Sequence, residues 1–191
     1  MKALILVDIQ NDFVPGGSLA VSKGDQIIPF VNQLQNDFDL IVATQDFHPQ
    51  NHASFAANHE GKNIGELIDL HGLDQVLWPV HCVQGSEGAE FVSSLDMSRV
   101  NKVFEKGTDP EIDSYSGFYD NGQRKSTGMA DYLKAQGVSE VHVVGLAADY
   151  CVKFTVLDAL KEGFKTVVYQ DGTKGVNLKP DDTEKAFQEM Q

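Results

Sequence analysis

The chain has 191 residues, of which 41% are hydrophobic and 23% charged, with 17 glycines and 6 prolines. This composition is typical of globular proteins and excludes the fibrous and disordered classes. Fifteen Lys and Arg against 28 Asp and Glu give a formal net charge of −13. Because this charge repels phosphate backbones and anionic bilayers, we expect neither a nucleic acid nor a membrane as partner. At this length we predict a single domain, residues 1–191.

The amino-terminal residues do not have the pattern of a targeting segment. No apolar run approaches the roughly 20 residues that span a bilayer. The opening MKALILVDIQ reaches the acid Asp8 too early for a secretory signal core, so we expect a cytoplasmic protein. Two cysteines, Cys82 and Cys151, are too few for a disulfide framework, and we expect both thiols to be reduced.

Short β-branched and apolar runs alternate with segments of helical periodicity along the chain. This alternation predicts an α/β fold, a three-layer, doubly wound, mostly parallel sheet flanked by helices on both faces. The predicted strands are Ala3–Val7, Leu40–Thr44, Gln75–Trp78, Asn101–Phe104, Glu140–Val144 and Lys165–Tyr169.

Two segments have the periodicity of half-buried helices. Asp25–Phe38 has one apolar stripe, formed by Ile27, Ile28, Val31, Leu34 and Phe38. Tyr150–Lys161 has another, formed by Val152, Val156, Leu157 and Leu160, and Gly163 is placed to end this helix. The long loops hold aromatic, histidine and acidic residues, so we predict that they are functional; they are Asn11–Gly24, Gln45–Asn63 and Glu105–Lys125.

Reactive side chains follow the predicted strands at their carboxyl ends, where open parallel sheets bind ligands. These residues are Asp8, Asp46, His48, His81, Lys106 and Cys151. Each of them alone is also compatible with an ordinary polar position at a strand end. Their combination favours a functional site.

Cys151 lies in GLAADYCV, just inside the first turn of a predicted helix that follows a buried strand. The helix dipole and free N–H groups there favour the thiolate, so we expect a lowered pKa and a nucleophilic role for Cys151. The alternative is a buried core cysteine, which helical spacing does not exclude. Cys82 has no helix start beside it, and we expect it to be structural.

Asp8 ends an apolar run, where a carboxylate is costly to bury unless a cation or a donor meets it. Lys106, at the end of another strand, is the natural partner, although a solvated lysine is the more usual state. With Cys151, these residues would supply the nucleophile, proton acceptor and charge balance of covalent catalysis.

The segment QDFHPQNH places Asp46, His48 and His52 close together, and His81 follows another predicted strand. Imidazoles with a carboxylate suit Zn, Fe or Mn and leave coordination positions open for water or substrate. The spacing alone is a weak signal, because D-x-H pairs also arise by chance in polar loops.

Together these motifs resemble those of the nicotinamidases, or pyrazinamidases, of the isochorismatase-like cysteine hydrolase superfamily. The matching segments are LILVDIQNDFVPGGSL, VATQDFHPQNHASF, LWPVHCVQGSEGAEF, VFEKGTDPEIDSYSGFYDN and VVGLAADYCVKFTVLDAL. They occur in this order over nearly the whole chain, and D-x-H followed by W-P-x-H-C is typical of the metal-binding branch.

The resemblance implies hydrolysis of nicotinamide to nicotinate and ammonia through a thioester, as part of NAD salvage, with pyrazinamide also accepted. It implies that Cys151 is the nucleophile, Asp8 the proton shuttle and Lys106 the third member of the triad. Asp46, His48 and His81 match ligands of one divalent ion, with zinc expected first and iron or manganese as alternatives. His52 matches a ligand of some members only, and we place it outside the direct ligand set.

The resemblance also implies that Phe13, Trp78 and Tyr115 line a pocket for the substrate ring. The backbone N–H groups of Ala147 and Cys151 would form an oxyanion hole, and family members carry a cis peptide at Leu146–Ala147. Family chains usually continue into a further strand past the helix matched by Asp182–Met190, whereas this sequence stops at Gln191.

Two alternatives and the oligomeric state stay open. Another hydrolase of the superfamily, such as an isochorismatase or an N-carbamoylsarcosine or ureidoacrylate amidohydrolase, would generally lack the metal-binding residues. A non-catalytic nicotinamide-binding protein would have no need of the nucleophile. A homo-oligomer is compatible with the sequence.

Overall fold

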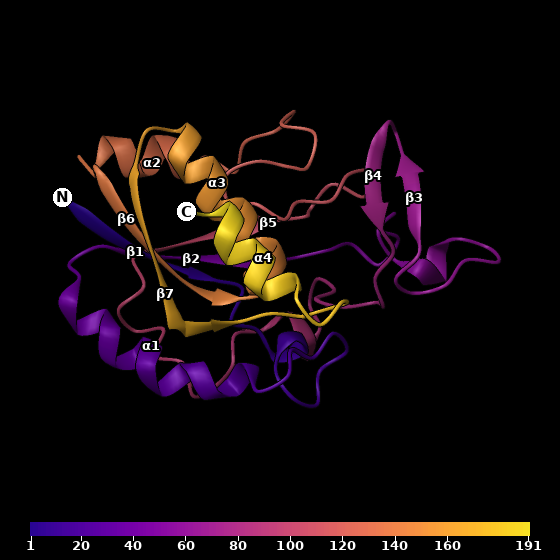
Figure 1. Ribbon diagram of the computed structural model, residues 1–191, viewed down its shortest axis with the longest axis horizontal. Helices are drawn as coiled ribbons and strands as arrows, with labels where there is room; N and C mark the ends of the chain where they lie inside the picture. Colours follow the sequence, from indigo (N-terminus) through magenta and orange to yellow (C-terminus); the bar gives the residue numbers. More distant parts are fainter.

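The computed structural model describes residues 1–191 and is built on a five-stranded sheet. The strand order is β5-β2-β1-β6-β7, and all neighbouring strands run parallel (Figure 1). The strands are β1 (Lys2–Val7), β2 (Ile41–Asp46), β5 (Lys102–Lys106), β6 (Glu140–Leu146) and β7 (Lys165–Lys174). The chain order reverses between β1 and β6, which is the place where open α/β sheets form a ligand-binding crevice.

Helices cover both faces of this sheet, which confirms the predicted three-layer α/β fold. Helix α1 (Ile28–Leu34) lies on one face, and α2 (Met129–Ala135) and α3 (Lys153–Lys161) lie on the other (Figure 1). Helix α4 (Asp182–Glu189) follows β7 and packs beside α3.

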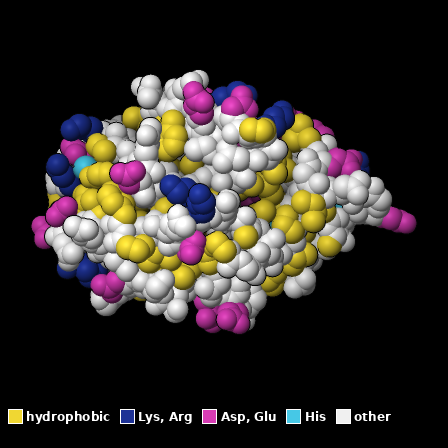
Figure 2. Space-filling view, turned by 60° about the horizontal axis from the view of Figure 1, so that its bottom comes forward, with side chains coloured by type: hydrophobic (Ala, Val, Ile, Leu, Met, Phe, Trp, Pro, Cys, Tyr) yellow, Lys and Arg dark blue, Asp and Glu magenta, His cyan; other side chains and the backbone are white.

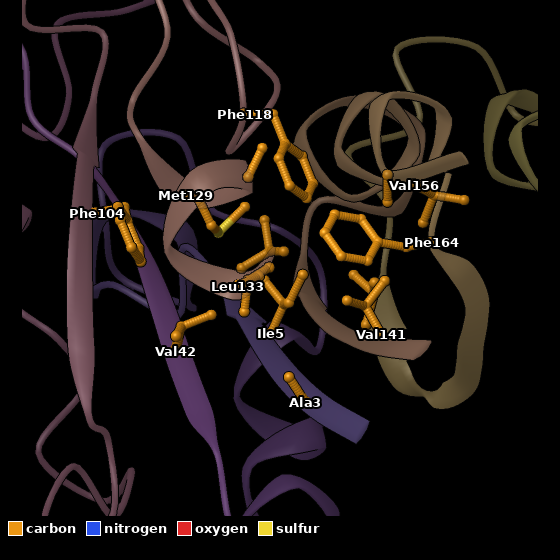
Figure 3. Close-up of a cluster of buried hydrophobic side chains, with 14 of the residues drawn as sticks. Ala3, Ile5, Val42, Phe104, Phe118, Met129, Leu133, Val141, Val156 and Phe164 are labelled. Atoms are coloured by element: carbon orange, nitrogen blue, oxygen red, sulfur yellow. The ribbon is translucent and has the colours of Figure 1, made fainter. Parts of the chain in front are cut away.

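The side chains of β1 alternate between two hydrophobic clusters, as the pleat of a central strand requires. Ile5 packs with Leu133 and Phe164 in the cluster beneath α2 and α3 (Figure 3). Leu4 and Leu6 point to the other face and join the residues of α1. A central strand that is buried on both faces explains why the run ALILV is apolar at every position.

The two predicted amphipathic segments are helical, with one error in their buried faces. All five residues of the stripe in Asp25–Phe38 are buried, and 3-10 turns at Gly24–Ile27 and Gln35–Asp37 extend α1 at both ends. In α3 the prediction for Leu160 is wrong, because this side chain is 47% exposed. The small residue Ala159 occupies the core position one turn after Val156, and Leu160 is therefore rotated toward solvent.

Helix α3 ends as predicted at Gly163. This residue has φ of +86°, which glycine adopts without a Cβ penalty. Its N–H donates to Leu160 O at 3.0 Å, and the N–H of Phe164 donates to Ala159 O at 3.0 Å. These two bonds form a Schellman motif, which satisfies carbonyls at the helix end.

The prediction that Gln75–Trp78 is a strand of the parallel sheet is wrong. Strand β4 (Leu73–Val76) pairs antiparallel with β3 (Leu67–Leu70) in a hairpin that stands apart from the main sheet (Figure 1). The two turn residues, His71 and Gly72, both have positive φ, as a tight hairpin turn requires. A short apolar run indicates burial without identifying the strand with which it pairs.

On the face of the molecule in Figure 2, acidic side chains lie both around the outline and within the face, and hydrophobic side chains are interspersed with polar ones. None of the helices combines the length and apolar composition needed to cross a bilayer.

Candidate active site

The carboxyl edge of the sheet brings together residues that end or follow four of its strands. Asp8 follows β1, Asp46 ends β2, Lys106 ends β5, and Cys151 lies beyond β6. All four are buried. These four side chains therefore lie together, as predicted.

The Lys106 ammonium is the centre of this cluster. Its Nζ lies 2.9 Å from Asp8 Oδ2 and 3.0 Å from Asp46 Oδ1, and it donates to Ser114 O at 2.9 Å. Burial acts against a charged amine, but the carboxylates of Asp46 and Asp8 raise the pKa of Lys106 well above its ordinary value. Lys106 is therefore a permanent cation, and its predicted pairing with Asp8 is confirmed.

Asp8 has the properties of a proton acceptor. Burial raises the pKa of this carboxyl, although Lys106 acts in the opposite direction. Oδ1 accepts a hydrogen bond from Thr44 Oγ1 at 2.6 Å, whereas Oδ2 is in the ion pair with Lys106 and has no hydrogen bond of its own. One carboxylate oxygen of Asp8 is thus available to take a proton at the centre of the cluster.

Cys151 lies 3.5 Å from Lys106, measured from Sγ to Nζ, in a π-helical turn (Ala148–Val152) that precedes α3. The expected lowering of its pKa is wrong. Burial raises the pKa of Cys151 well above its ordinary value, which Lys106 partly opposes and Asp8 increases. Desolvation is the largest influence on the pKa of this buried thiol, so a base must remove its proton.

Asp46, His48 and His81 form a second cluster beside the first. Asp46 Oδ2 lies 3.0 Å from His48 Nε2 and 3.2 Å from His81 Nε2. The Nδ1 atoms of the two histidines lie 2.8 Å from backbone carbonyls, those of Gly107 and Pro79. When Nδ1 donates to a carbonyl, Nε2 carries the lone pair that a metal needs.

The donor set of this second cluster fits a divalent cation. One carboxylate oxygen and two imidazole nitrogens lie within 4.8 Å of one another and are buried. Nitrogen and oxygen donors in this ratio suit zinc and its neighbours in the first transition row.

The His52 ring lies beside the His48 ring, with ring centroids 4.2 Å apart and the ring planes tilted by 44°. Its Nδ1 accepts the N–H of Ser54 at 3.2 Å and lies 2.7 Å from Ser54 Oγ. Its Nε2 is buried without a hydrogen-bond partner, and burial lowers the pKa of His52 to about 4. His52 is thus a neutral base, and its place outside the direct ligand set stays a prediction.

The three predicted aromatic residues line one pocket that Cys151 also faces. Its lining residues are Phe13, Leu19, Asp46, Trp78, His81, Asp113, Tyr115, Ala147, Tyr150, Cys151 and Val176. Trp78 Nε1 donates to the Tyr115 hydroxyl at 3.1 Å, which holds the two rings together. The Leu146–Ala147 peptide is cis, as the resemblance implies.

Several residues of the site were not predicted from the sequence. Gln75 Nε2 donates to Asp113 Oδ2 at 3.1 Å and to the Tyr115 hydroxyl at 3.2 Å, so it braces the pocket wall. Asp12 Oδ2 accepts the N–H of Cys82 at 2.7 Å and so ties down the segment that carries His81. Asp12 lies in the matching segment LILVDIQNDFVPGGSL, and this is the signal that could have indicated its role.

Comparison with known proteins identifies the family of this chain. Residues 2–191 match the isochorismatase domain. The chain belongs to the isochorismatase family. It shares 49% identity with the nicotinamidase of Escherichia coli over 99% of this chain and 90% of that protein.

Two solved structures have similar folds. A nicotinamidase/pyrazinamidase of Acinetobacter baumanii is 49% identical, with a TM-score of 0.97 over 100% of this chain and 91% of that one. The pyrazinamidase of Pyrococcus horikoshii in complex with zinc is 42% identical, with a TM-score of 0.80 over 99% of this chain and 93% of that one.

Proposed function

We propose that this protein is a nicotinamidase, an amidohydrolase that converts nicotinamide to nicotinate and ammonia. The observation that carries the proposal is the buried cluster of Cys151, Lys106 and Asp8 at an aromatic-lined pocket, beside a donor set that fits a metal. The identity to known nicotinamidases supports the choice of substrate. Pyrazinamide, whose ring also carries a nitrogen, is a second substrate, and the cellular role is NAD salvage in the cytoplasm.

The first step is transfer of the thiol proton to Asp8 while the sulfur of Cys151 attacks the carboxamide carbon. The C=O bond becomes a C–O⁻ bond, and the backbone N–H groups of Ala147 and Cys151 donate to this oxyanion. One such donor is worth roughly 3 kcal/mol in comparable sites. Lys106 stays protonated and balances the negative charge that moves between the sulfur and Asp8.

The second step breaks the C–N bond. Asp8 returns its proton to the departing nitrogen, so that ammonia leaves and a thioester to Cys151 remains. In the third step Asp8 deprotonates a water molecule, which attacks the thioester carbon. Collapse of this adduct breaks the C–S bond and releases nicotinic acid, which loses its proton to water and becomes nicotinate, while the sulfur recovers a proton from Asp8.

Phe13, Trp78 and Tyr115 would hold the pyridine ring against the sulfur by excluding water and limiting rotation. Asp46, His48 and His81 would hold one divalent ion, with zinc favoured by the zinc-bound relative. When bound, this ion supplies a Lewis-acid position for the ring nitrogen.

The test is an ammonia-release assay with nicotinamide, run with and without a chelator. The wild-type protein should release ammonia, Cys151→Ala should release none while keeping its thermal unfolding temperature, and Cys82→Ala should stay active if it folds. Because Cys82 is buried away from the pocket, it is the matched control. Ammonia release by Cys151→Ala would overturn the mechanism, and its absence from the wild-type protein would overturn the function.

A further inference from the structure

Gln10 is a fully buried amide that binds the backbone of Asp46. Its Oε1 accepts the Asp46 N–H at 2.8 Å, and its Nε2 donates to the Asp46 carbonyl at 2.8 Å. The same Nε2 donates to the carbonyl of Ala89 at 2.9 Å. One side chain thus satisfies both peptide groups of a single residue.

This arrangement supplies the hydrogen bonds that the Asp46 peptide groups lack because β1 has ended. The pairing of β1 with β2 stops at Val7 and Thr44, and Asp8 then turns the chain away with a left-handed φ of +48°. β2 continues to Asp46, whose peptide groups face the side that β1 has left. The carboxamide of Gln10 has the donor and acceptor of a peptide group and takes the place of the missing strand.

Asp46 belongs to both clusters of the site, so its position affects both. Its Oδ1 lies 3.0 Å from Lys106 Nζ, and its Oδ2 lies 3.0 and 3.2 Å from the Nε2 atoms of His48 and His81. A small shift of the Asp46 backbone would therefore change both the ligand set and the partner of the lysine.

We propose that Gln10 is a positioning residue that holds Asp46 with one carboxylate oxygen toward the metal ligands and the other toward Lys106. The inference rests on the proposed function, because it assumes that Asp46, His48 and His81 hold a metal. The side-chain hydrogen bonds of Gln10 go to the backbone of Asp46 and Ala89 and to neither histidine, so we expect it to act through Asp46.

The test measures zinc affinity by competition with a chromogenic chelator, so it does not depend on activity. Gln10→Met removes the donor and the acceptor at similar size, and zinc affinity should fall at least about tenfold, as is common for residues that orient a ligand. Gln35→Met is the matched control, because Gln35 is equally buried and donates to Asp96 O outside the site. Gln45→Met is a second control, because Gln45 donates to the same Ala89 carbonyl without binding Asp46.

Gln10→Glu removes the donor and adds a negative charge. It keeps an acceptor for the Asp46 N–H but turns an oxygen toward the Asp46 carbonyl, so zinc affinity should again fall at least about tenfold. Wild-type affinity in either folded Gln10 variant, or an equal loss in the two controls, would overturn the proposal. Failure of both Gln10 variants to fold would also overturn it, since Gln10 would then be a residue of the fold.

The same titration separates this inference from the proposed function. A wild-type protein that binds no zinc, iron or manganese would overturn the metal site and the role of Gln10 together. Equal metal affinity in the wild-type protein and in Gln10→Met would overturn the role of Gln10 and leave the metal site in place.

Discussion

Lys106 is the one cation among the buried groups that touch Cys151, and it balances two carboxylates. Its Nζ contacts Asp8, Asp46 and the thiol within 3.5 Å. Because burial raises the pKa of Cys151 and of Asp8, the thiol and the acid are both biased toward their neutral forms. Lys106 opposes both shifts, so it controls how readily the sulfur ionises.

The rate at which iodoacetamide alkylates Cys151 should measure how much of this thiol is ionised. Because the pKa of Cys151 is raised, its rate should still be rising at about pH 9.5, where an ordinary thiol of pKa about 8.5 is mostly ionised. Lys106→Met should slow the reaction at least about tenfold at a given pH, since one pKa unit is about a tenfold change in thiolate. Mass spectrometry of the labelled peptide, followed over time, gives the rate.

Lys102→Met is the control for this measurement. Lys102 is an exposed lysine of the same strand, β5, and its loss should leave the alkylation rate unchanged. A Cys151 rate that levels off near pH 7 would contradict the raised pKa of this thiol. Equal rates in the two lysine variants would contradict the assigned role of Lys106.

At the level of elements, the end of β5 is shaped to admit the imidazole of His48. Gly107 follows Lys106 with φ of +63°, and a Cβ at this position would lie 2.4 Å from His48 Cε1. The Gly107 carbonyl also lies 2.8 Å from His48 Nδ1. The strand end therefore both makes room for the ring and orients it.

Gly107→Ala should displace His48 and weaken zinc binding at least about tenfold. The positive φ and the close contact should together lower the free energy of unfolding by about 1–3 kcal/mol. Chelator competition and urea unfolding measure the two effects. Gly61→Ala is the matched control, because Gly61 has a similar φ of +71° but no atom lies within 4 Å of the position that a Cβ would take. An equal loss of zinc affinity in Gly61→Ala would contradict the steric explanation.

In the whole molecule, the two hydrophobic clusters share the central strand β1, and the site lies where that strand ends. Ile5 belongs to one cluster and Leu6 to the other, so neither face of the sheet can lose its packing alone. We therefore expect the predicted domain, residues 1–191, to unfold in one cooperative step.

Thermal unfolding followed by circular dichroism and by tryptophan fluorescence should give a single coincident transition. Zinc should raise the midpoint temperature of this transition, because an ion that binds only the folded chain stabilises the folded chain. At a zinc concentration 100 times the Kd, the stabilisation is about 2.7 kcal/mol. His48→Ala should remove this zinc-dependent increase. Two separate transitions would contradict the single domain, and an unchanged midpoint would contradict the metal site.

The amino-acid sequence by itself determined the α/β fold and the strand-end positions of Asp8, Asp46, Lys106 and Cys151. These depend on hydrophobic periodicity, which is local, and on the rule that parallel strands end at a common edge. The motifs added the pocket residues Phe13, Trp78 and Tyr115, which the structure places around Cys151.

Only the tertiary structure decided the pairing of β4 with β3, the raised pKa of Cys151 and the binding of Gln10 to Asp46. Each of these depends on groups that the folded chain brings together from distant positions. Desolvation of a thiol and satisfaction of a buried amide are set by that packing, which no pattern of neighbouring residues records.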